Sequence, residues 1–233
     1  MARQYRQPGS NGLTFDAQGR LTIDQHGHRR VIRVEPDGSH TILADRWRGL
    51  RLNSPNDLVY RADGSLYFTD PAFGLPQVDD DPRKETPHQG VYMLRDGRLT
   101  LLIDDLKGPN GLAFSHKQTH LYVGDWDEDH KVVVRYPVLP DGTLAPGEVF
   151  ADLTGEPGPE GIDGVKVDWA GNVYVCGPTG LWIFAPDGTR LGLLKNVESP
   201  HNIAFGDHDG RTLYMTCHTG VYRVRLATAG PVP

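Results

Sequence analysis

The stretch SPNDLVYRADGSLYFTDPAFG, residues 54–74, shows how this chain is built. It begins with a polar segment, Ser-Pro-Asn-Asp, and continues into a short apolar run over 58–60 that predicts a strand. Asp63-Gly64 suits a tight hairpin turn, so a second, antiparallel strand is predicted over 65–70. The stretch therefore predicts one β-hairpin with an amide and two carboxylates gathered at one end.

The same hairpin recurs along the 233 residues. A polar-then-apolar opening is found at 11–15, 56–60, 110–114, 163–167 and 202–205, each followed by a turn, a second strand and a third strand. Four of the five repeats add an outer strand. Four short antiparallel strands in about 40 to 50 residues are typical of a propeller blade, and no helical periodicity is sustained. The sequence predicts one all-β domain over 1–233, a β-propeller of five four-stranded blades.

Two segments stand apart from this pattern. The fifth repeat has three strands of its own, and residues 2–7 are predicted to supply the fourth and so close the propeller. Residues 77–89, QVDDDPRKETPHQ, are predicted to be a charged, solvated loop, with a lid as the less favoured alternative.

Composition excludes several classes of function. A net charge of −6 and a pI near 5.9 argue against a nucleic-acid surface. No apolar run approaches the roughly 20 residues of a membrane helix, and the first residues lack an apolar signal core. Cys176 and Cys217 fit neither a disulfide framework nor a zinc spacing. We expect a cytoplasmic protein, a monomer or small homo-oligomer, with no nucleic-acid or membrane partner.

The opening residue of each repeat is the candidate functional position. In a propeller the innermost strands line a central channel, so these residues would surround one axis. They are Asn11, Asn56, Asn110, Asp163 and Asn202. Amides with one carboxylate suit a hard cation such as calcium better than zinc, which prefers His and Cys. The alternative is that each Asn simply caps a turn.

Other polar residues are placed near this site by the same geometry. Asp57 follows Asn56 and is predicted to orient it. Asp70, Asp125 and His26 are predicted to lie near the mouth of the channel and to hold a hydroxyl-rich substrate. His201, before Asn202, is a further candidate to flank the site.

These segments also resemble a known family. SPNDLVYRADGSLYFTDPAFG, GPNGLAFS followed by LYVGDW, and GIDGVKVDWAGNVYV are similar to the SMP-30/gluconolactonase/LRE-like family, most closely to its bacterial gluconolactonase branch. The resemblance runs through essentially the whole chain. It implies a six-bladed propeller with one divalent ion, usually calcium, with Zn, Mn or Mg as alternatives, and hydrolysis of sugar lactones or related esters.

The resemblance also implies roles for individual residues. Asn56 and Asn110 match the family's amide ligands, and Asp163 matches its carboxylate ligand and general base. Asp57 matches a position behind the ligands or in contact with substrate, and Asn11 a pocket-lining position.

One feature of the family is not matched. Its first blade carries a Glu ligand in an E-G-P-x-W segment, which this sequence lacks, and one blade's worth of sequence is missing. Losing a carboxylate weakens calcium binding, because affinity follows ligand charge. Three hypotheses follow: a metal-dependent lactonase with Asp163 as base, a truncated or engineered non-catalytic propeller, and a phosphotriester hydrolase using the same pocket.

Overall fold

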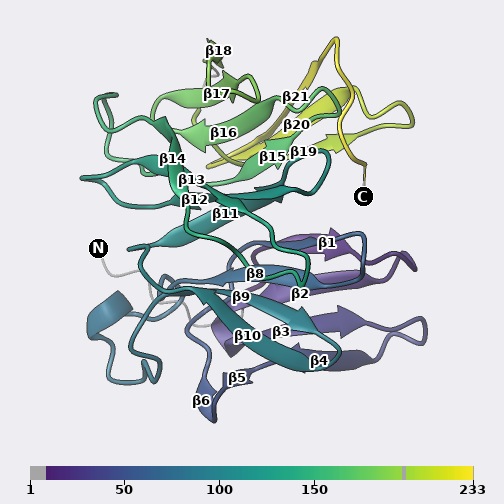
Figure 1. The fold of residues 1–233 in the computed structure, drawn as a ribbon, viewed down its shortest axis with the longest axis vertical. Helices are drawn as coiled ribbons and strands as arrows, with labels where there is room; N and C mark the ends of the chain where they lie inside the picture. Colours follow the sequence, from purple (N-terminus) through teal and green to yellow (C-terminus); the bar gives the residue numbers. More distant parts are fainter. Residues whose placement is uncertain (1–8, 196–197, 233) are drawn as a thin grey trace. The chain divides into compact units, whose positions relative to one another are not determined.

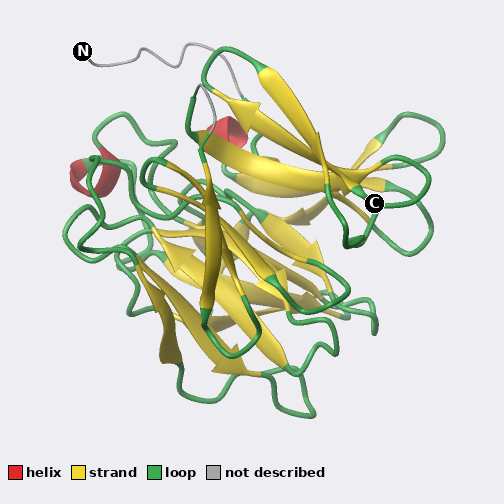
Figure 2. Cartoon of the chain, turned by 90° about the horizontal axis from the view of Figure 1, so that it is seen from above, coloured by secondary structure: helices red, strands yellow, loops and turns green. Residues whose placement is uncertain are grey.

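The computed structural model describes residues 9–195 and 198–232, and strands dominate it (Figure 2). The described helical elements are two single turns of 3-10 helix, η1 (His26–His28) and η2 (Val78–Asp80). Contacts group the chain into two compact units, Met1–Pro109 and Asn110–Pro233, and each unit is described by itself.

The first unit holds two four-stranded antiparallel sheets whose strands pair in chain order (Figure 1). The first sheet is β1 (Leu13–Phe15), β2 (Leu21–Gln25), β3 (Arg30–Val34) and β4 (His40–Ala44). The second is β7 (Leu58–Tyr60), β8 (Leu66–Asp70), β9 (Gly90–Arg95) and β10 (Arg98–Ile103). A small hairpin of β5 (Arg46–Trp47) and β6 (Leu50–Arg51) connects them along the chain.

The second unit holds two further four-stranded antiparallel sheets and, among the described residues, one of three strands. They are β11 (Pro109–Phe114), β12 (His120–Asp125), β13 (Val132–Pro137) and β14 (Glu148–Asp152); β15 (Val165–Val167), β16 (Val173–Gly177), β17 (Gly180–Phe184) and β18 (Arg190–Leu194); and β19 (Pro200–Gly206), β20 (Thr212–Cys217) and β21 (Val221–Arg225). The predicted fold class, all-β with β-propeller blades of four antiparallel strands in five repeats, is confirmed. The predicted closing strand at 2–7 lies outside the described residues.

The hairpin turns use the predicted Asp-Gly chemistry. At the turn between β7 and β8, the Asp63 carboxylate accepts a hydrogen bond from the Ser65 N–H at 3.0 Å, and Gly64 takes a φ of 87° that favours glycine. The same acceptor bond recurs at three further Asp-Gly-Ser or Asp-Gly-Thr turns, which begin at Asp37, Asp141 and Asp187. A short local motif therefore sets the ends of several strands.

Each unit buries its own apolar core between sheets. In the first unit, Val31, Leu58, Phe68 and Tyr92 pack in one cluster. In the second unit a larger cluster surrounds Trp182, which has no exposed surface and donates its indole N–H to the Pro178 carbonyl at 2.8 Å. A buried indole with a satisfied polar group is a strong determinant of packing.

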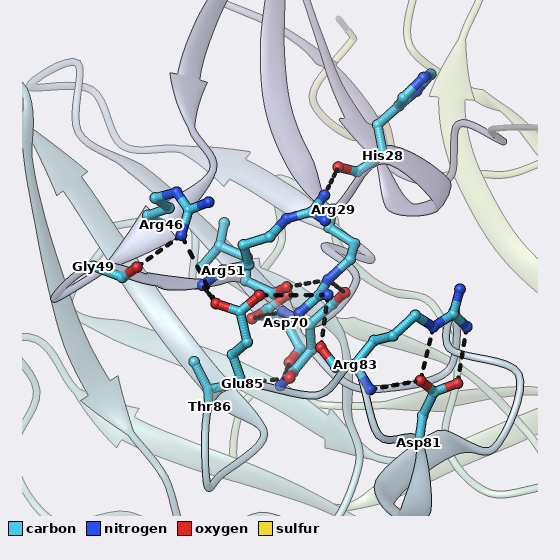
Figure 3. A network of polar contacts seen from close by, with 12 residues as sticks. His28, Arg29, Arg46, Gly49, Arg51, Asp70, Asp81, Arg83, Glu85 and Thr86 are labelled. Carbon is cyan, nitrogen blue, oxygen red and sulfur yellow. Dashed lines mark hydrogen bonds and ion pairs between the residues drawn. The ribbon is translucent and has the colours of Figure 1, made fainter.

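The residues of the loop at 77–89 are mostly exposed, as predicted, but a buried arginine anchors the loop to the rest of the first unit. Arg29 donates to the carbonyls of Leu52 and Asn53 and, at 2.8 Å, to that of Arg83 in the loop (Figure 3). Within the loop, Asp81 and Thr86 are 4% and 1% exposed. The loop is thus part of the first unit's framework, because buried polar groups that have found partners are costly to release.

A prediction for stability follows from Trp182 and Trp169, two of the three tryptophans of the second unit. Trp182→Ala should lower the free energy of unfolding by about 3 to 5 kcal/mol, since it removes a large, fully buried side chain. Trp169, 53% exposed, provides the matched control, and Trp169→Ala should cost less than about 1 kcal/mol. Urea denaturation measures both, and equal losses would contradict the packing described here.

Candidate functional site

The opening residue of a repeat is held by backbone bonds to the second strand of its own sheet. In the second unit the Asp163 N–H donates to the Cys176 carbonyl, and the Cys176 N–H donates back to the Gly164 carbonyl, both at 2.9 Å. In the first unit Asn11 and Gly12 make the same pair of bonds with Asp24. The side chain of the opening residue therefore projects from a backbone that is fixed on both sides.

Glycine after the opening residue brings successive repeats into close contact. A Cβ added at Gly111 would lie 2.3 Å from the Asp163 carbonyl oxygen, and one added at Gly164 would lie 2.4 Å from Asn202 Oδ1. These spaces cannot hold a side chain, so glycine is required for the approach. The openings of the three repeats of the second unit are thereby stacked against one another.

The fifth opening residue is His201, so the prediction that placed Asn202 there is wrong by one position. Gly164 donates its N–H to the His201 carbonyl, as Gly12 does to that of Asn56. Asn202 Oδ1 accepts the next backbone N–H, that of Ile203, at 2.8 Å. The reason is the alternation of the strand: Ile203 and Phe205 are both 3% exposed, which fixes the face on which each neighbour lies.

Asp163 and two histidines form a connected polar chain at this end of the second unit. His201 Nδ1 lies 2.9 Å from Asp163 Oδ2, and His201 Nε2 lies 3.2 Å from the nearer ring nitrogen of His218. The imidazoles meet edge to face with centroids 4.3 Å apart. The Asp163 and His201 side chains are 21% and 34% exposed, so both are partly accessible.

Asn110 contributes a buried oxygen in the adjacent repeat. The residue is 3% exposed, and its Oδ1 accepts no hydrogen bond from the described part of the chain. A buried amide oxygen without a partner is costly, and amide and carboxylate oxygens are the donors that calcium prefers. Asn110 and Asp163 therefore fit a hard cation. Across 9–195 and 198–232, no three His, Cys, Asp or Glu side chains are arranged to hold a metal, so a cation would also need amide, backbone or solvent oxygens.

A small pocket opens beside Asp163 within the second unit. Its lining includes Trp126, Glu160, Asp163, Cys176 and His201. An aromatic residue, two carboxylate residues and a histidine thus surround an empty space of about 190 Å³, which is smaller than a typical small-molecule site. Glu160 was not among the predicted site residues, because its place depends on the path of the 153–162 loop rather than on a strand motif. Asp125, predicted to contact substrate, is 4% exposed at the end of β12.

The first unit holds the remaining predicted residues. Asn11 is exposed, whereas Asn56 and Asp57 are 8% and 3% exposed. Asp57 Oδ1 accepts the Leu58 N–H at 2.9 Å, and the Asp57 N–H donates to Thr69 Oγ1 at 3.1 Å. The ligand role of Asn56 and the orienting role of Asp57 stay predictions.

Asp70 and His26 are embedded in the framework of the first unit. Asp70 has no exposed surface and accepts the Asn53 N–H at 2.7 Å; burial raises its pKa from 3.8 to about 7. Asp24 is also fully buried, and burial together with the charges of Asp57 and Asp70 raises its pKa well above the usual range. His26 is partly buried, which lowers its pKa. Their predicted contacts with substrate stay predictions.

The Asp70 carboxyl should make stability depend on pH in a definite direction. Its pKa is higher folded than unfolded, so its stabilisation is complete below about pH 4 and is lost as the pH rises through about 7. Relative to Asp70→Asn, the wild-type protein should lose on the order of 4 kcal/mol over that range.

Urea denaturation at several pH values tests this dependence. Asp96→Asn is the control, because the Asp96 side chain is 96% exposed. If the stability difference between wild type and Asp70→Asn does not change with pH, Asp70 is not the titrating group.

Comparison with known proteins shows to which family this chain is related. The model of the SMP-30/gluconolactonase/LRE-like region matches residues 1–219. The chain belongs to this family. The prediction drawn from the sequence motifs is confirmed.

Individual family members are similar over most of the chain. A gluconolactonase of Zymomonas mobilis is 37% identical over 98% of the chain and 66% of its own length. A solved structure from Xanthomonas campestris, described as a gluconolactonase important in glucose secondary metabolic pathways, is 35% identical with a TM-score of 0.81, covering 93% of this chain and 72% of that one. The chain thus spans slightly less than two thirds of the Zymomonas relative.

More distant relatives share the fold. A luciferin-regenerating enzyme is 18% identical, with a TM-score of 0.79 over 97% of this chain and 81% of that one. At this identity the likeness concerns the fold alone. Within the described segments, none of the helices has the length and apolar character needed to cross a membrane.

Proposed function

We propose that the protein hydrolyses sugar lactones such as gluconolactone in the pocket beside Asp163. The observation that carries the proposal is the grouping, in one unit, of a partly exposed carboxylate, a buried amide oxygen without a partner among the described residues, and a small pocket whose lining includes Trp126. Similarity to gluconolactonases at 35–37% identity supports the same class of reaction.

Different side chains of the second unit would have different roles in the reaction. Asp163 takes a proton from water as the water oxygen attacks the lactone carbonyl carbon. The ring C–O bond then breaks, and the proton passes to the departing ring oxygen, so that the product is an open aldonic acid. Trp126 and Glu160 line the small pocket beside Asp163, which would cover part of the sugar ring.

Asn110 and Asp163 would hold a calcium-type cation. Such a cation supplies Lewis-acid polarisation of the carbonyl group. Neutral amides and one carboxylate form a weakly charged donor set, which predicts modest affinity.

Calcium titration tests the proposal directly. Metal-stripped protein should bind calcium saturably by calorimetry, and calcium should raise its melting temperature, because a ligand that binds only the folded state stabilises it. Gluconolactone opening should appear with calcium and stop with a chelator. Binding without turnover would reject the lactonase, and neither binding nor turnover in the folded protein would favour a non-catalytic propeller. Activity assays with a panel of substrates that includes a phosphotriester distinguish lactone hydrolysis from the third hypothesis, phosphotriester hydrolysis.

Asp163→Asn should remove both a ligand charge and the base. We expect turnover to fall by at least about 100-fold and calcium affinity to fall with it. Asp57→Ala should have a smaller effect on both, since its carboxylate bonds to its own backbone neighbour. Full metal-dependent turnover in Asp163→Asn would show that Asp163 is not the base.

A further inference from the structure

His201 contacts the Asp163–Gly164 dipeptide at two points. Its carbonyl oxygen accepts the Gly164 N–H at 2.9 Å, and its Nδ1 lies 2.9 Å from Asp163 Oδ2. One contact fixes the backbone beneath the carboxylate and the other engages the carboxylate itself. Asp163 is thus held from the neighbouring strand β19 as well as from its own sheet.

The chemistry of the pair defines the direction of the hydrogen bond. An ionised carboxylate only accepts, so His201 Nδ1 carries the proton and donates it to Asp163 Oδ2. The other nitrogen, Nε2, then faces His218 at 3.2 Å. Because an imidazole with both nitrogens engaged has a restricted ring orientation, its Nδ1–H points in a fixed direction.

We propose that His201 is a positioning residue for Asp163: its Nδ1–H holds Oδ2 and so fixes how the carboxylate is presented to a cation and to water. The inference rests on the proposed function and deepens it. His201 occupies in the fifth repeat the place that Asp163 and Asn110 occupy in theirs, so the same backbone geometry aims all three side chains at one end of the second unit.

The alternative is that His201 is a surface residue whose contact with Asp163 has no consequence. Hydrogen-bonding partners of metal ligands typically change metal affinity or activity by 10- to 100-fold when removed. A surface residue would change neither. The two interpretations therefore predict calcium affinities and kcat values for a His201 variant that differ by a measurable factor.

The test uses three substitutions at His201 in the full chain. In asparagine the amide nitrogen lies at the position of Nδ1, whereas in glutamine it lies near that of Nε2. His201→Asn should keep calcium affinity and kcat within about 3-fold of wild type, while His201→Ala and His201→Gln should lower both by 10- to 100-fold. The KM for gluconolactone should change less than kcat, because the lost contact orients the carboxylate rather than the sugar.

Calorimetric titration with calcium provides a readout independent of turnover, and melting temperatures without metal confirm that each variant is folded. His218→Ala should have a smaller effect than His201→Ala, since His218 contacts His201. Unchanged calcium affinity and kcat in His201→Ala, failure of His201→Asn to restore them, or absence of calcium binding by wild type would each overturn the inference. A loss of affinity rescued by asparagine, in a protein that opens no lactone, would support the positioning role and reject the proposed reaction.

Discussion

The close approach at Gly111 and Gly164 is the constraint on which the site of the second unit depends. Neither position has room for a Cβ, because the backbone of the next repeat fills the space at Gly111 and Asn202 fills it at Gly164. This contact places the openings of the three repeats against one another. It therefore also positions the residues that precede Gly111, Gly164 and Asn202. Asn110, Asp163 and His201 are therefore brought to one end of the unit by backbone geometry, before any side chain makes a bond.

Burial separates the roles of the polar residues in this arrangement. Neutral amides tolerate burial when a partner or ligand satisfies them, and Asn110 is 3% exposed. The ionisable pair Asp163 and His201 stays partly exposed and is satisfied by mutual contact. In the first unit the carboxyls of Asp24 and Asp70 are fully buried instead. Burial raises their pKa and favours the neutral acid. The carboxylate proposed as the base, Asp163, is thus the accessible one.

Much of the fold could be predicted from local sequence. The Asp-Gly turns and the alternation of apolar residues fixed the repeats, their order and their antiparallel pairing, because both signals act over a few residues. The resemblance to the family likewise rests on short motifs such as SPND and DGVKVD. Asp163 was found because it is the carboxylate among repeated amides.

Long-range contacts account for what was missed. The role of Arg29 depends on carbonyls more than 20 and 50 residues away, which no local motif encodes. The register of the fifth repeat was misjudged because Asn202 resembles the other amides. The correct register can nevertheless be derived from the sequence. His201-Asn202-Ile203-Ala204-Phe205 aligns with Asn110-Gly111-Leu112-Ala113-Phe114 when the buried apolar residues, rather than the amides, are matched. Side-chain chemistry can vary between repeats, whereas a shift of one residue would turn Ile203 and Phe205 out of the core. The apolar alternation is therefore the safer guide to functional positions in a repeated fold, and here it identifies a histidine where an amide was expected.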